Sequence, residues 1–516
     1  MTLRQVGQLH TSIHLQYITG IEKAYTTASI FSNEEDSMSL LRKLSRLSLG
    51  RRFPCQFQQH REFVIGKVLA LGAVALVGRL AYNHYKEILR KGRSIDRSND
   101  GKTQELEAPL DQQDSFGIDI GSSFSRIAIR QADKSEPFMA LNRDGKRSIP
   151  SVVRFPRGIN VTEQFLIDIN QGSYVVGAAA SLSRFTESDT TFTGSSLISP
   201  VDCLESSLQL LEIEKSFIFE LLAKDLKVSV QSKYERPEVV PAFVSVPNFF
   251  TATQTALLIS ACRDAGLNCV ASIPDSISAI LGSIELGLYT PPSSIQSKSR
   301  ETVCVVDVGG SFVQMSILSM KNRANSIPTI LAQKTLTNNG GNFFDDALVE
   351  HLMTQYSKLN GGVALSVDRR NKQLLYDAAE FAKIELSSAK STKVQIPFIS
   401  SSDEGLKHLE CEVSKAELEI LLDDLMRDIQ SSFKDLLIQT SKQVTPITAN
   451  EGEQGTEVKG LGINLAAVLL VGGGARMPLI KSRMTDVIGD VPLLISQRPE
   501  EVVVLGASAF QKIAEY

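Results

Sequence analysis

Cysteine and histidine are scarce in this sequence, and neither occurs in a metal-binding arrangement. The only two histidines within four residues of each other are His10 and His14. The cysteines are spread along the chain without a C-x-x-C pair: Cys55, Cys203, Cys262, Cys269, Cys304 and Cys411. The sequence therefore indicates neither a zinc site nor a disulfide framework, and we expect buried, reduced thiols.

An excess of positive charge is also missing. Lysine and arginine number 54 against 58 acidic residues, for a formal net charge of -4. Nucleic acid is therefore not expected as a partner, because binding through phosphates needs a basic surface. Hydrophobic residues make up 42% and charged residues 22% of the chain. These ordinary values exclude a disordered, collagen-like or polytopic membrane protein. The 516 residues predict about three domain-sized units.

Acidic residues are absent between Ser37 and Arg61, where six basic residues occur. Leucines in this run fall mostly on one face of a predicted helix. Amphipathic segments rich in arginine and serine and poor in acid are typical of transit peptides. We therefore predict that residues 1–62 are a targeting region of low order that directs the protein to mitochondria, with the chloroplast as the alternative. A solvated amphipathic helix of the mature protein is the competing interpretation.

Residues 63–82 (FVIGKVLALGAVALVGRLAY) form one apolar run that Lys67 and Arg79 interrupt. A spanning helix needs about 20 mainly apolar residues, and long cationic side chains near its ends can reach the interface. We predict a single membrane anchor here. A buried helix and an extension of the targeting signal are the alternatives. Residues 83–114 are polar and predict a linker.

From Ser115 onward, short β-branched strands alternate with helical stretches and glycine turns, which predicts an α/β fold. Residues 116–130 (FGIDIGSSFSRIAIR) predict a β-hairpin, and residues 303–318 (VCVVDVGGSFVQMSIL) repeat its design. Each hairpin places an aspartate, Asp119 or Asp307, beside small residues whose NH groups can approach a phosphate. Such an aspartate can order Mg²⁺ or an attacking water, or simply cap the hairpin.

A third glycine turn strengthens this interpretation. Residues 468–478 (VLLVGGGARMP) form an apolar strand that opens into three glycines before a helix. A turn of this kind lets a planar ring and a sugar lie against the backbone.

The order of segments from Ser115 to Tyr516 resembles the ATPase domain of the 70-kDa heat-shock protein (DnaK-type chaperone) family. Further matching segments are RSIPSVVRF, PAFVSVPNFFTATQ with the switch proline at Pro247, TNNGGNFFDDALVEHL, AAEFAKIELSSA and RPEEVVVLGASAF. The resemblance implies an α/β, actin-like two-lobed ATPase fold over residues 115–516, with duplicated β-sheet subdomains flanked by helices.

The resemblance also implies a site for ATP or ADP with Mg²⁺. It gives catalytic roles to Asp119, Asp275 and Asp307, with Asp119 and Asp307 binding the metal. Glu380 and Lys383 would bond the ribose, and Arg476 would stack on adenine. The other nucleotide-binding positions that it implies are Gly121, Ser122, Ser123, Gly309, Gly310, Gly340, Gly341, Ser387, Gly472, Gly473 and Glu500.

Several departures from the family pattern fall at this site. The lysine that holds the attacking water in the family falls on Ser195, and serine cannot replace a cation aimed at developing charge. The other departures place Asp275 at a glutamate, Gln314 at a distal carboxylate, Asn342 and Phe343 at an acidic pair, and Ile384 at an adenine-side arginine. Together they predict weakened metal and phosphate handling with a partly preserved nucleoside pocket.

The sequence ends at Tyr516 without the peptide-binding domain of full-length family members, so we expect no ATP-controlled clamping of peptides by this chain. Residues 443–463 (QVTPITANEGEQGTEVKGLGI) are polar and predict a flexible surface loop.

The leading hypothesis is a chaperone-like protein that binds ATP or ADP with weak or absent hydrolysis. It would assist or regulate protein folding or import, with partners such as co-chaperones or exchange factors. One alternative is a slow Mg²⁺-dependent ATPase in which Lys146, Arg147 or another cation replaces the missing lysine. Another is a nucleotide-free scaffold that retains the fold. A small-molecule kinase of the same superfamily is disfavoured, because the collinear segments match chaperones.

Overall fold

The computed structural model describes residues 113–134, 136–156, 174–198, 215–291, 300–321, 327–402, 405–448, 456–458 and 460–511. They belong to one compact unit, Gly101–Tyr516. The predicted targeting region (1–62), the predicted anchor (63–82) and nearly all of the predicted linker (83–114) lie outside the described residues. Within the described ranges, no helix has the length and apolar character needed to cross a membrane.

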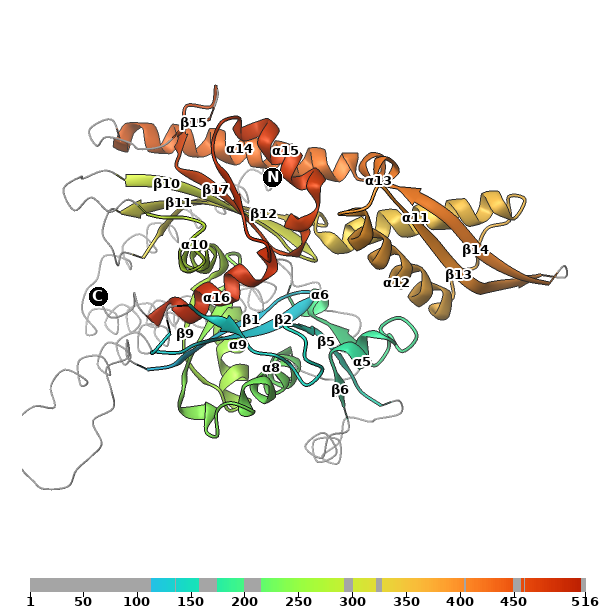
Figure 1. Cartoon of the computed structure of the whole chain (residues 1–516), viewed down its shortest axis with the longest axis horizontal. Coiled ribbons are helices and arrows are strands. Elements are labelled where there is room, and N and C mark those ends of the chain that lie inside the picture. The colour runs from blue at the N-terminus through green and yellow to red at the C-terminus, as the bar shows by residue number, and fades with distance from the viewer. Residues whose placement is uncertain are drawn as a thin grey trace, which may run out of the picture. The chain divides into compact units, whose positions relative to one another are not determined.

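Two β-sheets with the same topology organise the chain (Figure 1). In each sheet a hairpin and a third strand run antiparallel, and two further strands run parallel to the first strand of the hairpin. The first sheet has the order β3-β2-β1-β8-β9, with strands β3 (Phe138–Met139), β2 (Phe124–Arg130), β1 (Ser115–Ile120), β8 (Pro241–Val246) and β9 (Asn268–Pro274). The second has the order β12-β11-β10-β17-β18, with strands β12 (Thr329–Thr337), β11 (Phe312–Lys321), β10 (Arg300–Val308), β17 (Ala467–Val471) and β18 (Leu493–Ile495). The α/β class and the internal repeat predicted from the sequence are confirmed.

The two aspartates of the repeat occupy equivalent places. Asp119 lies opposite Arg126 in the β1–β2 hairpin, and Asp307 lies opposite Gln314 in the β10–β11 hairpin. The sequences of the central strands are nearly continuous apolar runs, because both faces of their sheets are covered. On the first sheet, helices α8 (Lys215–Gln231) and α9 (Ala252–Asp264) contribute to the same core as β1 and β8. A capping box of Thr251 and Gln254 starts α9.

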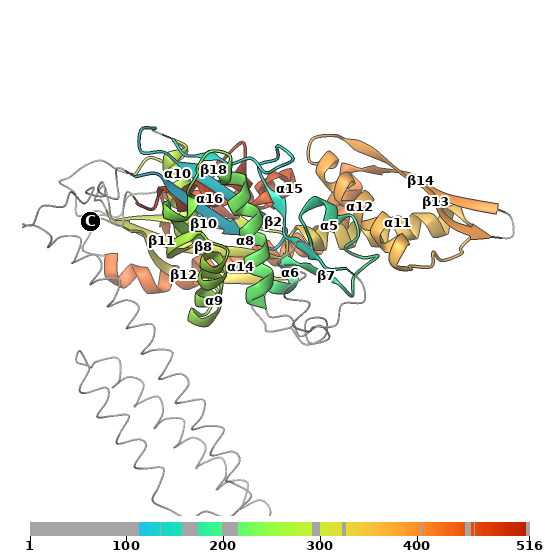
Figure 2. The same cartoon turned by 90° about the horizontal axis from the view of Figure 1, so that it is seen from below.

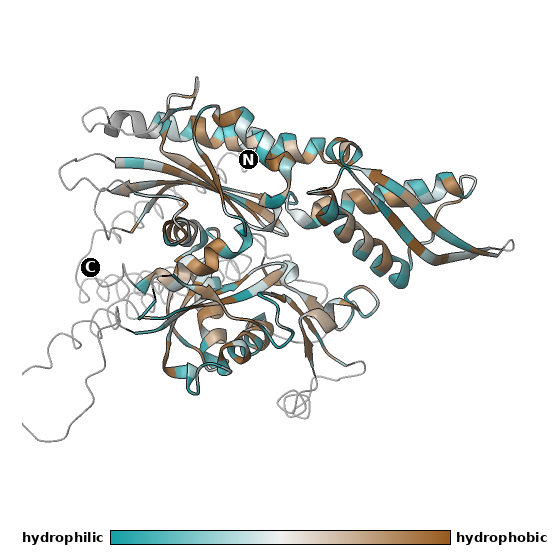
Figure 3. Cartoon of the chain, in the orientation of Figure 1, coloured by the Kyte–Doolittle hydropathy of each residue, from teal (hydrophilic) through white to brown (hydrophobic). Residues whose placement is uncertain are grey.

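Helices α10 (Asp275–Glu285) and α16 (Val502–Ala509) lie between the two sheets, where Figure 3 shows them mostly hydrophobic. One buried cluster joins these helices to strands of both sheets. The helix backbones touch at two glycines. A Cβ added at Gly282 would overlap the carbonyl oxygen of Val502, and one at Gly506 would overlap that of Ser278. Only glycine permits so close a crossing.

The second sheet carries a helical extension. Helices α11 (Gly341–Leu359) and α12 (Arg369–Leu386) pack on the hairpin of β13 (Ser391–Ser402) and β14 (Gly405–Ser414), as Figure 2 shows. Helix α13 (Lys415–Leu421) follows the hairpin, and α14 (Asp423–Thr448) and α15 (Pro478–Ile488) cover one face of the sheet. We call the first sheet and its helices the first lobe, and the second sheet with this extension the second lobe.

Smaller elements complete the first lobe. Strands β5 (Val152–Arg154), β6 (Val175–Val176) and β7 (Thr191–Thr193) form a separate sheet, and β4 (Ile149–Pro150) pairs with β2. The short helices here are α5 (Ala178–Ser181), α6 (Gly194–Leu197) and the 3-10 turn η3 (Pro237–Val239).

In the second lobe, the 3-10 turns η4 (Gly473–Arg476) and η5 (Pro499–Glu501) follow β17 and β18.

The predicted loop at residues 443–463 differs from the structure. Helix α14 continues to Thr448, because extending an existing helix does not repeat the cost of nucleation. Strands β15 (Thr456–Glu457) and β16 (Asn464–Leu465) then pair. Val458, Ile463 and Leu465 are buried and anchor this segment to the core. Of the predicted loop, residues 449–455 and 459 lie outside the described residues.

The described cysteines fit the expectation of reduced thiols. Cys262, Cys269, Cys304 and Cys411 are free, and all but Cys411 are buried. Burial raises the pKa of these thiols, which keeps them protonated and unreactive. Cys55 and Cys203 lie outside the described residues.

Candidate functional site

The turns of the two repeated hairpins face each other. Each is closed by the same hydrogen bond of 3.1 Å, from Gly121 N to Phe124 O and from Gly309 N to Phe312 O. The turns also touch across the lobes, because Ser311 N donates to Ser122 Oγ over 3.2 Å. A Cβ added at Gly310 would overlap Ser123 Oγ. The structure thus brings together Gly121, Ser122, Ser123, Gly309 and Gly310.

The glycine pair Gly340 and Gly341, also predicted from the resemblance, joins these turns. Gly341 N donates to Gly309 O over 2.9 Å, and Asn342 N donates to Gly310 O over 2.8 Å. A Cβ at Gly340 would lie 2.5 Å from Gly310 O, so the chain can approach here only with glycine.

Asn342 connects these loops through its side chain. Its Oδ1 accepts from Ser123 Oγ over 3.3 Å, and its Nδ2 donates to Ser195 Oγ over 3.0 Å and to Ser311 Oγ over 3.3 Å. Ser195 Oγ donates in turn to Ser122 O over 3.3 Å. The hydroxyl groups of these serines and the amide of Asn342 therefore link the two lobes directly. Ser195, which takes part in this network, stands at the position of the family's lysine.

The carboxylates of Asp119, Asp275 and Asp307 lie close to one another near these turns. Burial raises the pKa of Asp307 to about 7, with repulsion from Asp119 adding to the shift and Arg126 opposing it. Burial also raises the pKa of Asp119, while Arg126 and Ser245 oppose the shift. The pKa of Asp275, the first residue of α10, is raised well above its usual range by burial and by repulsion from the other two. These three side chains form one interacting group.

Gln314 holds Asp275 in place. Its Nε2 donates to Asp275 Oδ2 over 3.2 Å, and its Oε1 accepts from Asn248 N over 2.8 Å. The side-chain amide of Gln314 therefore occupies the position where the family has a carboxylate, and both of its polar atoms are hydrogen-bonded within the chain.

Arg126 is a site residue that the sequence reasoning missed. Its Nη1 lies 3.5 Å from Asp119 Oδ2, and the two side chains are only 12% and 18% exposed. The guanidinium also lies 5.6 Å from the centre of the Phe124 ring. The sequence did contain a signal for this contact, because the register of the predicted hairpin sets Arg126 directly opposite Asp119.

The residues predicted to contact the nucleoside are engaged with other residues of the chain. Arg476 donates to both carboxylate oxygens of Glu500, over 2.9 Å and 2.6 Å. Burial alone would raise the pKa of Glu500, but its hydrogen bonds to Arg476 and to the backbone, together with the charges of Arg476 and Arg126, outweigh burial and lower the pKa. Lys383 Nζ donates to Asp345 Oδ2 over 2.8 Å and to Gly341 O over 3.0 Å.

The remaining predicted positions have separate surroundings. Glu380 pairs with Arg184 Nη2 over 3.6 Å, and Ser387 Oγ donates to Lys383 O over 3.1 Å. Gly472 has a φ of 84°, and a Cβ there would overlap Asp307 Oδ1. Gly473 faces open space, with no atom within 4 Å of a Cβ built on it.

A second contact between the lobes lies at α12. Arg369 donates to both carboxylate oxygens of Asp189, over 2.7 Å and 2.9 Å. The rings of Phe185 and Tyr376 lie 4.6 Å apart, and Phe185 N donates to Gln373 Oε1 over 3.0 Å.

The surroundings of Asp119 do not fit a bound Mg²⁺ in this arrangement. Asp119, one of the two predicted ligands, already faces the guanidinium of Arg126. Asp275 Oδ2 accepts from Gln314. Across the described part of the chain, no group of three or more histidine, cysteine or acidic side chains is placed to hold a metal ion.

Comparison with known proteins identifies the family. The family model described as Hsp70 protein matches residues 217–515. The chaperone protein DnaK of Gracilaria tenuistipitata var. liui is 29% identical over 405 residues, which cover 76% of this chain and 59% of that protein. The DnaK proteins of Guillardia theta and Emiliania huxleyi are 27% and 28% identical, over 76% of this chain and 58% and 59% of their own lengths.

The fold is that of an actin-like two-lobed ATPase domain, and the chain belongs to the Hsp70 family. The family predicted from the sequence is therefore confirmed. The chain spans less than two thirds of the length of these relatives.

Proposed function

We propose that this chain binds ATP or ADP between its lobes with weak or absent hydrolysis, and that it assists or regulates protein folding or import through protein partners. Membership of the family and the meeting of the glycine turns support nucleotide binding. Co-chaperones or exchange factors are the partners that the family suggests.

One observation carries the proposal of weak hydrolysis. Ser195 stands at the position of the family's lysine and hydrogen-bonds to Ser122 O and Asn342 Nδ2. A neutral hydroxyl cannot stabilise the negative charge that develops as a phosphate bond breaks, and loss of one such donor costs about 100-fold or more in rate. Binding does not need this charge to the same degree.

Calorimetric titration of the full chain with ADP and ATP, combined with a phosphate-release assay, tests the proposal. We expect micromolar or tighter binding and little turnover. A Ser195→Lys variant should increase turnover, while Ser196→Lys, on the exposed side of α6, serves as the matched control. Absence of heat and of thermal stabilisation at millimolar nucleotide would overturn the proposal, and rapid turnover by the wild type would refute its second half.

The second candidate is a nucleotide-free scaffold. The pairing of Arg476 with Glu500, of Lys383 with Asp345 and of Glu380 with Arg184 favours it, because a nucleotide would have to compete with these contacts. A scaffold would bind its protein partner equally well with and without nucleotide. In the slow-ATPase alternative Lys146 is the better candidate for the replacing cation, since Arg147 pairs with Glu501 over 2.8 Å.

Mitochondrial targeting, with the chloroplast as the alternative, and a single membrane anchor remain part of this proposal. The composition of residues 1–62 and of residues 63–82 supports them. Fusing residues 1–62 and residues 1–90 separately to a fluorescent protein would test both. Import of the first fusion and carbonate-resistant membrane association of the second alone are the expected results.

A further inference from the structure

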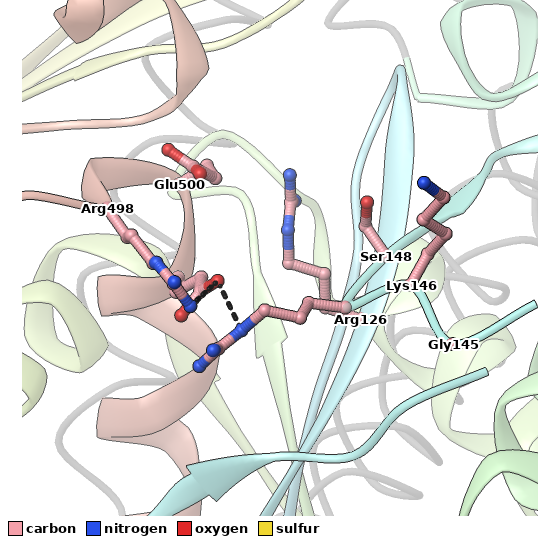
Figure 4. Close-up of a pocket in the computed structure, with 8 residues that line it drawn as sticks. Arg126, Gly145, Lys146, Ser148, Arg498 and Glu500 are labelled. Atoms are coloured by element: carbon pink, nitrogen blue, oxygen red, sulfur yellow. Dashed lines mark ion pairs between the residues drawn. The ribbon is translucent and has the colours of Figure 1, made fainter.

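A cavity of about 360 Å³ opens beside the candidate site, as Figure 4 shows. Arg126 and Lys146 project from the first lobe, and Arg498 and Glu500 lie across from them. The lining residues are Arg126, Gly145, Lys146, Arg147, Ser148, Arg498, Glu500 and Glu501. The size lies at the lower end of the range of roughly 300–1,000 Å³ found for small-molecule sites.

Both acids of the cavity are already neutralised. Glu501 Oε1 lies 2.8 Å from Arg147 Nε and 3.7 Å from Arg498 Nη1. Glu500 forms the two-bonded pair with Arg476, which is not one of the lining residues. The lining holds four cationic side chains against two acidic ones, so positive charge is in excess at this cavity, and Arg126 and Lys146 are the two cations that do not pair with Glu501.

Arg126 is the better placed of these two cations. Its side chain is 12% exposed, whereas Lys146 belongs to an exposed turn. Its contact with Asp119, at 3.5 Å, is longer than a charge-assisted hydrogen bond, which typically measures about 2.7–2.9 Å. A nearly buried guanidinium with one long contact retains donors for a second anion. Phosphate oxygens match its planar fork.

We infer that Arg126 supplies the positive charge that a divalent cation supplies to bound phosphates in related sites, so that this cavity takes a nucleoside diphosphate free of metal. The inference rests on the proposed nucleotide binding and adds the form in which the nucleotide is bound. The fixed guanidinium beside Asp119 both offsets phosphate charge and repels a metal ion from that carboxylate. A free nucleoside diphosphate is the ligand that such a site recognises.

Titration of the full chain with ADP, once in EDTA and once in excess Mg²⁺, tests this inference. The dissociation constant of the wild type should differ by less than about threefold between the two conditions. Arg126→Gln should raise the dissociation constant in EDTA by about tenfold or more, because a charged partner is lost. Arg126→Lys should retain most of the affinity in EDTA. Arg143→Gln removes the same charge from an exposed place outside the cavity and should change nothing.

The outcomes separate the two proposals. Binding only with Mg²⁺ would refute the inference and leave the proposed nucleotide binding intact. No binding in either condition would refute the proposed function itself. Equal affinity of the wild type and a folded Arg126→Gln variant in EDTA would show that Arg126 is not the source of charge. If Arg126→Gln does not fold, the wild-type comparison and Arg126→Lys decide the question.

Discussion

Arg126 and Gln314 occupy the same place in the two halves of the fold, each opposite an aspartate across a hairpin. Arg126 faces Asp119 and lines a cavity, whereas Gln314 turns its amide to Asp275 and Asn248. Equivalent positions of a repeated unit therefore carry a charge in one half and a neutral amide in the other, which makes the site electrostatically asymmetric.

Asn342 is predicted to hold the two lobes together. Asn342→Ala removes its hydrogen bonds to Ser123, Ser195 and Ser311, and we expect a loss of about 1–2 kcal/mol in unfolding free energy. Hydrogen exchange should become faster at the amides of both glycine turns. Asn360→Ala, which removes a bond to Tyr356 O at the end of α11, is the control and should leave those amides protected. Unchanged exchange in Asn342→Ala would contradict the prediction.

The contribution of Asp307 to stability is predicted to fall as the pH rises from about 4 to about 7. In the unfolded chain Asp307 loses its proton near the usual pKa of 3.8, but in the folded chain it keeps the proton up to about 7. The folded state therefore binds more protons between these values, and its stability decreases with pH until both states are ionised. Asp119 and Asp275 shift in the same direction.

Asp307→Asn should reduce this pH dependence. The midpoint temperature of unfolding should differ less between pH 5 and pH 8 than in the wild type, by roughly 2 °C or more. Thermal unfolding in matched buffers measures it. Asp346→Asn is the control, because Asp346 bonds to Tyr376 outside the group of three carboxylates. An equal pH dependence of the midpoint in Asp307→Asn and the wild type would refute the assignment.

The crossing of α10 and α16 should tolerate no added side chain. Gly282→Val or Gly506→Val is expected to cost about 3 kcal/mol or more, because each new side chain meets backbone. Urea unfolding, or the soluble yield where the variant is too unstable, gives the measure. Gly473→Ala, where nothing lies within 4 Å, should unfold like the wild type. A stable Gly282→Val protein would show that the helices can separate.

Arg369 is predicted to control the second contact between the lobes. Arg369→Glu places like charges opposite each other at Asp189, and repulsion should expose the amide of Phe185 to exchange. Thermal stability should change little, since exposed ion pairs contribute little to stability. Arg370→Glu, whose guanidinium instead donates to Phe398 O, should leave the Phe185 amide protected.

Much of the fold could be predicted from the sequence, because strands, glycine turns and their repetition are local patterns. The pairing of Arg126 with Asp119 could also have been derived from the hairpin register. The contacts of Asn342 could not, because they join residues 147 and 219 positions apart in the chain. The same holds for Arg476 with Glu500, where the sequence indicated two ligands and the structure shows partners of each other. The loop at 443–463 was predicted from polarity, which conceals the few apolar residues that anchor it.

The contact of Gly282 with Gly506 also limits how the lobes can move. Two helices whose backbones touch cannot slide apart without opening a cavity, but they can change their crossing angle at little cost in packing. At this crossing we therefore expect the lobes to move relative to each other by rotation rather than by translation. In Figure 1 the β13–β14 hairpin lies at the end of the second lobe that is remote from this crossing, so a partner bound there would act on the crossing through a long lever arm.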